Sequence, residues 1–187
     1  WALYESAGGP GWVFSDDRPN NWGKGEPCHC RWAGVTCLNG TACSDSPVVK
    51  IDFNGAFADY GMNATGTLPG SIFAGLAELD YFWMSGNPKL SGSIPAGWAA
   101  MTKMQELVLR SNPRLSGTLP TAWSTMTKME NLALYSNSRL SGTLPTAWST
   151  MTEMQDLELN SNPRLSGTLP PAWATMTKML GLKLYSN

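Results

Sequence analysis

This chain has little histidine and none of the usual catalytic motifs. His29 is the single histidine among 187 residues. There is no G-x-S-x-G or H-E-x-x-H motif, no glycine-rich phosphate loop and no spaced pair of isolated acidic residues. The sequence therefore predicts a protein that is not an enzyme and that needs no cofactor.

Long apolar runs are absent as well. No segment approaches the roughly 18 apolar residues that a membrane-spanning helix needs, and no apolar signal segment follows Trp1. We expect a processed or truncated chain that associates with a membrane only through a segment outside this sequence. The chain also lacks an excess of charge of one sign, since it has 13 basic and 14 acidic residues. This balance favours neither nucleic acid nor an anionic membrane as a partner.

Cysteine is scarce and confined to the N-terminal region, at Cys28, Cys30, Cys37 and Cys43. An even number of cysteines there predicts disulfides and an oxidising compartment, although four cysteines allow three pairings. Zinc is the competing interpretation of Cys28-His29-Cys30, but C-x-C is not the usual ligand spacing and no second C-x₂-C pair exists. Two N-x-[ST] sequons, at Asn39 and Asn63, agree with secretion and predict N-glycosylation. We therefore expect an extracellular or cell-surface glycoprotein without a metal site.

A 25-residue period fills more than half of the chain. Residues 115–139 read LSGTLPTAWSTMTKMENLALYSNSR, residues 140–164 are nearly identical, and further copies occupy 90–114 and, in degenerate or shortened form, 65–89 and 165–187. Such self-similarity predicts a solenoid, whose turns bury their apolar faces only against one another. We predict an N-terminal cap at 1–47 and repeats at 48–187. The last turn has no polar cap, so we expect that the parent protein continues or that this end assembles with another molecule.

The first half of each repeat predicts a strand. Leu107 and Leu109 alternate with outward-facing positions, so they point inward, and stacked copies form a parallel sheet with strands roughly 4.8 Å apart. Asn112 follows this strand, where a buried amide can satisfy loop backbone groups that have no sheet partner. Equivalent asparagines recur once per turn, at Asn87, Asn137, Asn162 and Asn187.

The second half of the repeat predicts the return path. Gly117 suits a positive φ or a crowded position, and Pro120 ends a short extended piece. Trp123, Met126 and Met129 follow at 3–4-residue spacing, which fits a short helical or 3₁₀ turn on the outer side. We interpret the tryptophans and methionines as core, not as ligand-stacking or metal sites. The predicted fold class is thus an α/β solenoid, with a parallel sheet on one face and short helical or 3₁₀ turns on the other.

The motif L-x-x-L-x-x-L-x-L-x-x-N-x-x-L-x-G-x-L-P, often with Met in its first positions, resembles the leucine-rich repeat, and its L-x-G-x-[IL]-P portion resembles the plant-type extracellular subclass. The segment C-R-W-A-G-V-T-C resembles the cap of that subclass; by this resemblance Cys30 pairs with Cys37, which leaves Cys28 with Cys43. The phrase S-G-T-L-P-x-x-W-x-x-M is similar to trypanosomatid surface antigens of the promastigote type, and the start of the cap to repeat proteins of other unicellular eukaryotes. The resemblance implies extracellular recognition of a protein or glycan, without chemistry.

The outward strand positions are the candidate binding surface. The copies at 115–139 and 140–164 differ at six positions, four of them on the strand, so the framework is kept while the sheet face varies. Drift of exposed positions after duplication is an equally good account of this pattern. Aromatic and arginine side chains are the types that anchor interfaces. The candidate ligand-binding residues are Tyr81, Trp83, Glu106, Arg110, Tyr135, Asp156, Glu158, Lys183 and Tyr185.

Two further columns and one other role remain as alternatives. A basic column at Lys89, Arg114, Arg139 and Arg164 suits anionic glycans, or is a solvated loop whose aliphatic stems cover Leu and Pro. A threonine column at Thr118, Thr143 and Thr168 could order water, as in ice-binding solenoids. Near-identical turns and an uncapped end also suit a structural subunit of a surface coat or extracellular filament, which assembles with itself.

Overall fold

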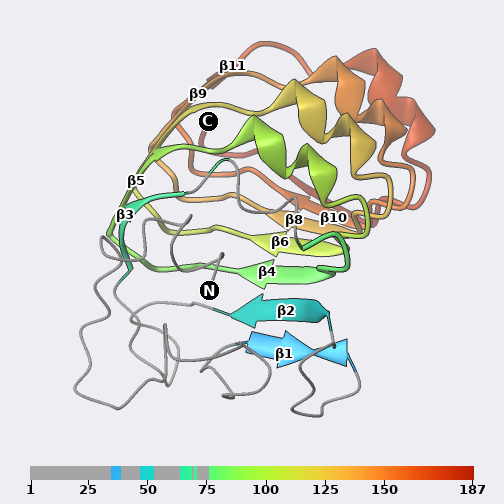
Figure 1. Ribbon diagram of the computed structural model, residues 1–187. Helices are drawn as coiled ribbons and strands as arrows, with labels where there is room; N and C mark the ends of the chain where they lie inside the picture. The colour runs from blue at the N-terminus through green and yellow to red at the C-terminus, as the bar shows by residue number, and fades with distance from the viewer. Residues whose placement is uncertain (1–34, 39–46, 53–63, 69, 71–75) are drawn as a thin grey trace.

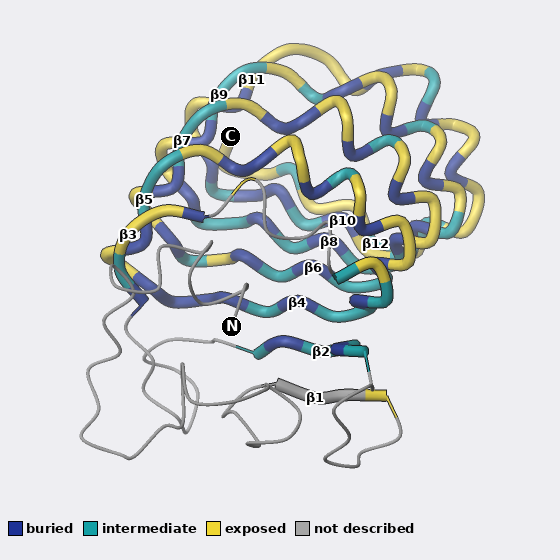
Figure 2. The backbone as a smooth tube through the Cα atoms, viewed as in Figure 1, coloured by how far each residue is buried: buried dark blue, intermediate teal, exposed yellow. Residues whose placement is uncertain are grey.

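The computed structural model describes residues 35–38, 47–52, 64–68, 70 and 76–187. Within them the chain is a solenoid of stacked turns, in which two sheets and a row of short 3₁₀ helices surround the core (Figure 1). Apolar side chains fill the inside of every turn from Leu79 to Met176, while exposed residues lie on the outside (Figure 2). This arrangement confirms the predicted solenoid.

The first sheet, here called sheet A, carries the candidate surface. Its strand order is β1-β2-β4-β6-β8-β10-β12, and all its pairings are parallel except that of β1 with β2. Glu106 lies opposite both Tyr81 and Asn131, so the outward columns inferred from the repeat are confirmed. The strands are β1 Val35–Cys37, β2 Val48–Asp52, β4 Tyr81–Trp83, β6 Glu106–Val108, β8 Asn131–Ala133, β10 Asp156–Glu158 and β12 Gly181–Lys183.

A second parallel sheet, sheet B, was not predicted. It follows the order β11-β9-β7-β5-β3 and is built from the L-S-G-[TS] phrase of each repeat. Gly117 has φ +84° there, and a Cβ on it would lie 3.2 Å from the Cβ of Ser93, so the expected positive φ and crowding both apply. The strands are β3 Thr65–Thr67, β5 Lys89–Ser93, β7 Arg114–Thr118, β9 Arg139–Thr143 and β11 Arg164–Ser166.

The return path is a 3₁₀ helix in each turn, and it begins directly after a proline. These helices are η4 Ala96–Ala100, η5 Thr121–Thr125, η6 Thr146–Thr150 and η7 Pro171–Thr175. Each presents one buried tryptophan to the core, and successive indole rings lie 6.2 Å apart and nearly parallel. This spacing exceeds the about 4.8 Å between paired strands. The solenoid therefore curves, with sheet A on its inner side.

The buried asparagines form a continuous ladder between turns. The side-chain oxygen of Asn137 accepts the backbone N–H of Asn112 at 2.8 Å, and the oxygen of Asn162 does the same for Asn137. The amide nitrogen of Asn137 donates to the carbonyls of Leu134 and Leu109, at 2.7 and 3.1 Å. The predicted structural role of this column is thus confirmed.

Parts of the predicted cap lie outside the described residues. These are Cys28, Cys30 and Cys43, the side chain of Cys37, and the sequon residue Asn39. The second sequon residue, Asn63, lies in the predicted repeats and is also outside the described residues. The disulfides and the glycosylation therefore stay predictions. The described strand β1 falls within the predicted cap and pairs antiparallel with β2, the first strand of the predicted repeats.

Candidate functional site

The outward face of sheet A bears an open groove of 530 Å³ that crosses strands β4, β6, β8 and β10. Each of the four turns supplies two to four of its lining residues. Its lining residues are Trp83, Ser85, Glu106, Val108, Arg110, Asn131, Leu132, Ala133, Tyr135, Asp156 and Glu158.

Side-chain size along one column explains why the groove forms. Trp83, Val108, Ala133 and Glu158 follow one another at the same register position of four neighbouring strands. The two small side chains in the middle leave room above the sheet, and the two large ones form walls on either side. The groove thus follows from residue choice on an otherwise regular sheet.

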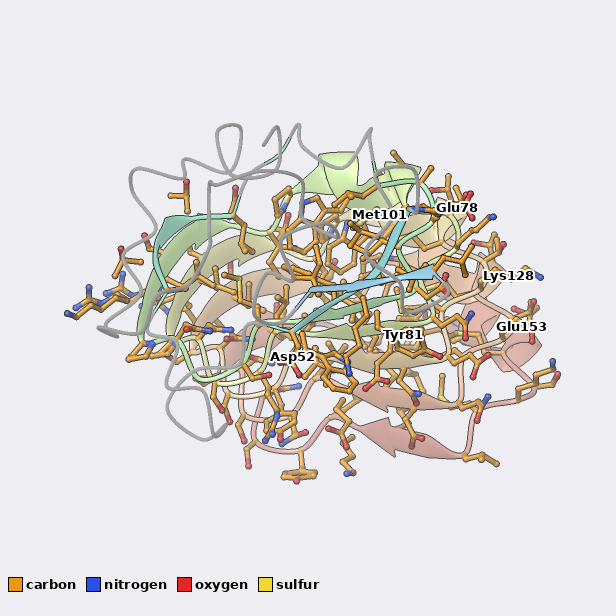
Figure 3. The ribbon with its side chains drawn as sticks, turned by 60° about the horizontal axis from the view of Figure 1, so that its bottom comes forward. Asp52, Glu78, Tyr81, Met101, Lys128 and Glu153 are labelled. Atoms are coloured by element: carbon orange, nitrogen blue, oxygen red, sulfur yellow. The ribbon has the colours of Figure 1, made fainter. Side chains whose placement is uncertain are left out.

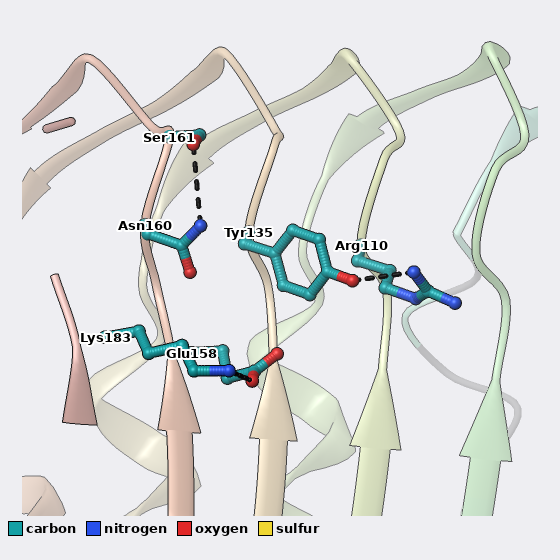
Figure 4. A network of polar contacts seen from close by, with 6 residues as sticks. All are labelled: Arg110, Tyr135, Glu158, Asn160, Ser161 and Lys183. Atoms are coloured by element: carbon teal, nitrogen blue, oxygen red, sulfur yellow. Dashed lines mark hydrogen bonds and ion pairs between the residues drawn. The ribbon is translucent and has the colours of Figure 1, made fainter. Parts of the chain in front are cut away.

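Arg110 and Tyr135 occupy the end of the groove beyond the carboxyl ends of the strands. The Arg110 Nη1 group donates to the Tyr135 hydroxyl oxygen at 2.6 Å, and its guanidinium lies 5.6 Å from the ring centroid (Figure 4). Arg110 is exposed and Tyr135 is half-buried, so both retain surface for a partner. The pair presents a planar cation and an aromatic ring side by side, two groups that are common at binding hot spots.

Trp83 and Glu106 form the wall nearest the N-terminus. The Lys50 ammonium lies 3.7 Å from the centroid of the Trp83 ring, and Lys50 belongs to β2, on the side of Trp83 away from the groove. Burial raises the pKa of Glu106, while Lys50 and the indole N–H of Trp83 oppose this rise. The indole nitrogen is buried, and its approach to the Glu106 carboxyl does not have the geometry of a formed hydrogen bond.

The opposite wall is acidic. Glu158 forms an ion pair with Lys183 of the next turn (Figure 4). Asp156, two residues earlier on the same strand, is exposed. A Cβ at Gly181 would lie only 2.1 Å from the Asp156 Oδ1 atom, so the Asp156 carboxylate leans over β12. The groove therefore has three carboxylates, one guanidinium and an apolar floor.

The structure brings six of the predicted site residues together and leaves three apart. Trp83, Glu106, Arg110, Tyr135, Asp156 and Glu158 line the groove. Tyr81 lies on the sheet face (Figure 3). Its hydroxyl donates a hydrogen bond of 3.3 Å to the Gln105 side-chain oxygen. Lys183 contacts the groove only through Glu158, and Tyr185 is 64% exposed in the last turn.

Sequence reasoning missed the floor and rim of the groove. The outward columns include Val108, Asn131 and Ala133. Choosing candidate binding residues by type favours large and charged side chains, so these smaller ones were not chosen. The contrast between Ala133 and its neighbours Val108 and Glu158 in the same column was the available signal. No comparable signal marks Ser85 or Leu132.

The described part of the chain offers neither a metal site nor a membrane-spanning helix. It contains no group of three His, Cys, Asp or Glu side chains placed to hold a metal ion. None of its helices has the length and apolar character to cross a membrane.

No family model matches the chain. Among solved structures, the leucine-rich repeat (LRR) ectodomain of the Arabidopsis thaliana receptor kinase GASSHO1/SCHENGEN3, in complex with CASPARIAN STRIP INTEGRITY FACTOR 2, is 24% identical; the match has a TM-score of 0.79 and covers 98% of this chain and 20% of that one. The plant peptide hormone receptor RGFR1 in complex with RGF2 is 25% identical, with a TM-score of 0.64 over 83% of this chain and 25% of that one. A plant ice-binding protein is 26% identical, with a TM-score of 0.68; the match covers 84% of this chain and 46% of that one.

The chain thus spans about a fifth to a quarter of the two receptor ectodomains that it resembles. These similarities support the plant-type part of the sequence resemblance and leave the trypanosomatid part a prediction. Two parallel sheets, a buried asparagine ladder and 3₁₀ return segments together give this chain the fold of leucine-rich repeat solenoids.

Proposed function

We propose that this chain is a non-enzymatic extracellular or cell-surface recognition module, which binds an extended segment of a protein ligand across sheet A. The groove over strands β4–β10 carries this proposal, because it is the place where outward side chains of four turns converge. Four strands about 4.8 Å apart span about 14 Å, the length of roughly four extended residues. An extended peptide would therefore fill it from wall to wall.

The chemistry of the groove suits such a ligand. Val108 and Ala133 provide an apolar floor for a side chain, while Trp83 and Tyr135 provide flat aromatic surfaces. Arg110 and the carboxylates offer hydrogen-bond donors and acceptors for a peptide backbone and its polar side chains. A glycan is the alternative ligand, since sugars also stack on aromatic rings and bind carboxylates.

Three further observations support an extracellular setting. The two sequons and the even number of cysteines fit secretion. The similar solved structures include receptor ectodomains, one of them described as a peptide hormone receptor. These similarities favour the recognition hypothesis over a structural role. Sedimentation of the parent protein as a polymer would instead support the structural role.

Affinity selection from a random peptide library tests the proposal. Peptides that bind the parent chain should lose at least about 1 kcal/mol of binding free energy, or about fivefold in affinity, on Arg110→Ala and on Tyr135→Ala. Thr127→Ala and Lys128→Ala, on the exposed segment that follows η5, are the matched controls and should change nothing. The proposal fails if no peptide is enriched or if all four variants bind alike. Enrichment from a glycan array instead would identify the alternative ligand.

Ice binding is a second candidate function, favoured by one observation. Thr118, Thr143 and Thr168 are exposed and recur once per turn at or just beyond the end of a sheet B strand, and a plant ice-binding protein shares the fold at 26% identity. The cations at the start of the same strands interrupt a threonine surface. A thermal hysteresis assay separates the two functions: recognition predicts none, whereas hysteresis that is lost in a Thr118→Val and Thr143→Val double variant would establish ice binding.

A further inference from the structure

Opposite charges are segregated in this solenoid. Each of the four segments that lead into and form sheet B holds one cation and no acidic residue. These segments are 86–93, 111–118, 136–143 and 161–168. We call these four cations, Lys89, Arg114, Arg139 and Arg164, the basic ridge. All are exposed, and each is the first residue of a strand of sheet B. Each arginine pairs with the serine two residues after the preceding cation, so the four cations form an oblique row with one cation per turn.

Three other lysines of the repeats form ion pairs with a carboxylate of the neighbouring turn. Lys103 forms an ion pair with Glu78, and Lys178 forms one with Glu153, each 25 residues earlier in the chain. Glu78, Lys128 and Glu153 lie along one edge of the molecule (Figure 3). On the basic ridge the residue one turn away is another cation, and no carboxylate of the described residues forms an ion pair with any of the four.

We propose that the basic ridge is a binding site for a linear anionic polysaccharide that carries sulfate or uronate groups. A row of like charges repels itself, and a polymer of opposite charge relieves this repulsion along the whole row. Arginine suits this role, because its planar guanidinium binds two oxygens of a sulfate or carboxylate at once. Each neutralised charge also releases a condensed counterion from the polymer, as in nucleic acid binding, so the affinity falls as salt rises.

The surroundings of the ridge favour a polysaccharide over other polyanions. The four segments contain no aromatic side chain on which a nucleic acid base could stack. Their leucines are buried, so the segments offer no large apolar side chain to enter a membrane. Ser116 and Ser141 lie two residues after their cations and donate to glycine carbonyls of the preceding turn, which leaves their oxygens free to accept hydrogen bonds from sugar hydroxyls.

This site is independent of the proposed peptide groove. The ridge begins sheet B, whereas the groove lies on the outward face of sheet A, where carboxylates prevail. Both could be occupied together, since the two sets share no residue.

Binding of defined polymers to the immobilised protein tests the ridge. The probes are dextran sulfate for sulfate groups, polygalacturonate for uronate groups, neutral dextran as the blank and a single-stranded DNA of matched charge. We expect at least one anionic polysaccharide to bind, neutral dextran not to bind, and the affinity to fall at least about tenfold between roughly 50 and 200 mM salt. Equal or tighter binding of the DNA would overturn the assignment to polysaccharide.

A triple variant locates the site. Arg114→Gln, Arg139→Gln and Arg164→Gln together should weaken polysaccharide binding by about tenfold or more. The triple variant Lys103→Gln, Lys128→Gln and Lys178→Gln removes the same charge from another edge and should lose less than about twofold. Thermal melts check that both variants are folded. Equal losses in the two variants, or parent-like binding by the arginine variant, would overturn the proposal.

Discussion

The indole N–H of Trp148 donates a hydrogen bond of 2.9 Å to the carbonyl oxygen of Pro120, the proline that precedes the 3₁₀ helix of the previous turn. Trp123 makes the same bond to Pro95 and Trp173 makes it to Pro145. The tryptophan column therefore does more than fill a leucine position. Its indole hydrogen bonds connect each 3₁₀ helix to the start of the 3₁₀ helix in the preceding turn, while the stacked rings fill the core.

This bond leads to a prediction about stability. Trp148→Phe should destabilise the solenoid by about 1–3 kcal/mol, because it removes one hydrogen bond and leaves a cavity where the larger ring packed. Trp173→Phe removes the equivalent bond in the last turn, where the ring is less enclosed, and should cost less. Urea unfolding measures both; a Trp148→Phe chain as stable as the parent would show that the bond contributes nothing.

The asparagine ladder offers a second stability test. Asn137→Ala should cost roughly 1–3 kcal/mol, because it leaves the buried N–H of Asn112 without its acceptor. It also removes one of the two asparagine donors to each of the Leu134 and Leu109 carbonyls. Asn187→Ala is the control, since that exposed side chain accepts only one bond, from the Asn162 N–H. Similar melting temperatures for the two variants would contradict the ladder's role.

Glu106 gives a prediction about pH. Burial raises the pKa of Glu106 above its unfolded value, so ionising the carboxyl costs more in the folded chain. The destabilisation therefore grows as the pH rises from the unfolded pKa through the folded one, and it is complete above both. We expect Glu106→Gln to improve the melting temperature relative to the parent more at about pH 7 than at about pH 4.

Glu153 is the matched case of opposite sign. A hydrogen bond from Lys178 lowers its pKa, so its contribution to stability is present above the unfolded pKa and is lost as the pH falls through the folded one. Glu153→Gln should therefore lower the melting temperature at neutral pH and have less effect in acid. Identical pH profiles for the two variants would contradict these assignments.

The cap gives a covalent prediction. We expect disulfides Cys30–Cys37 and Cys28–Cys43, which peptide mapping under non-reducing conditions would detect. Cys37→Ser should then destabilise the cap by about 2–5 kcal/mol, as in other small secreted domains, and the cap should unfold before the repeats. Free thiols at these four positions would refute the pairing.

The repeat made much of the fold predictable. Period-two leucines located the strands of sheet A, the 25-residue spacing set their register, and the recurring asparagine and tryptophan could be assigned to the core. Sheet B could not be recognised, because Gly117 and its equivalents adopt a positive φ within strands that lack apolar alternation. The bonds from the indoles to proline carbonyls depend on the distance between turns, which sequence spacing alone does not determine.

The site was only partly predictable, for a related reason. The outward columns were predicted correctly. The groove, however, arises from a difference in side-chain size between neighbouring strands. It depends on the small side chains of Val108 and Ala133 lying between the large ones of Trp83 and Glu158. The pairing of Arg110 with Tyr135 across turns likewise depends on side-chain reach.

The most direct test of the recognition account is NMR mapping of the isotope-labelled chain with the tightest-binding peptide recovered from a random library. The account predicts that the largest chemical-shift changes fall on the Trp83 indole and on the backbone amides of Val108 and Ala133. Changes confined to the 3₁₀ helices, or to the last turn around Lys183, would contradict it.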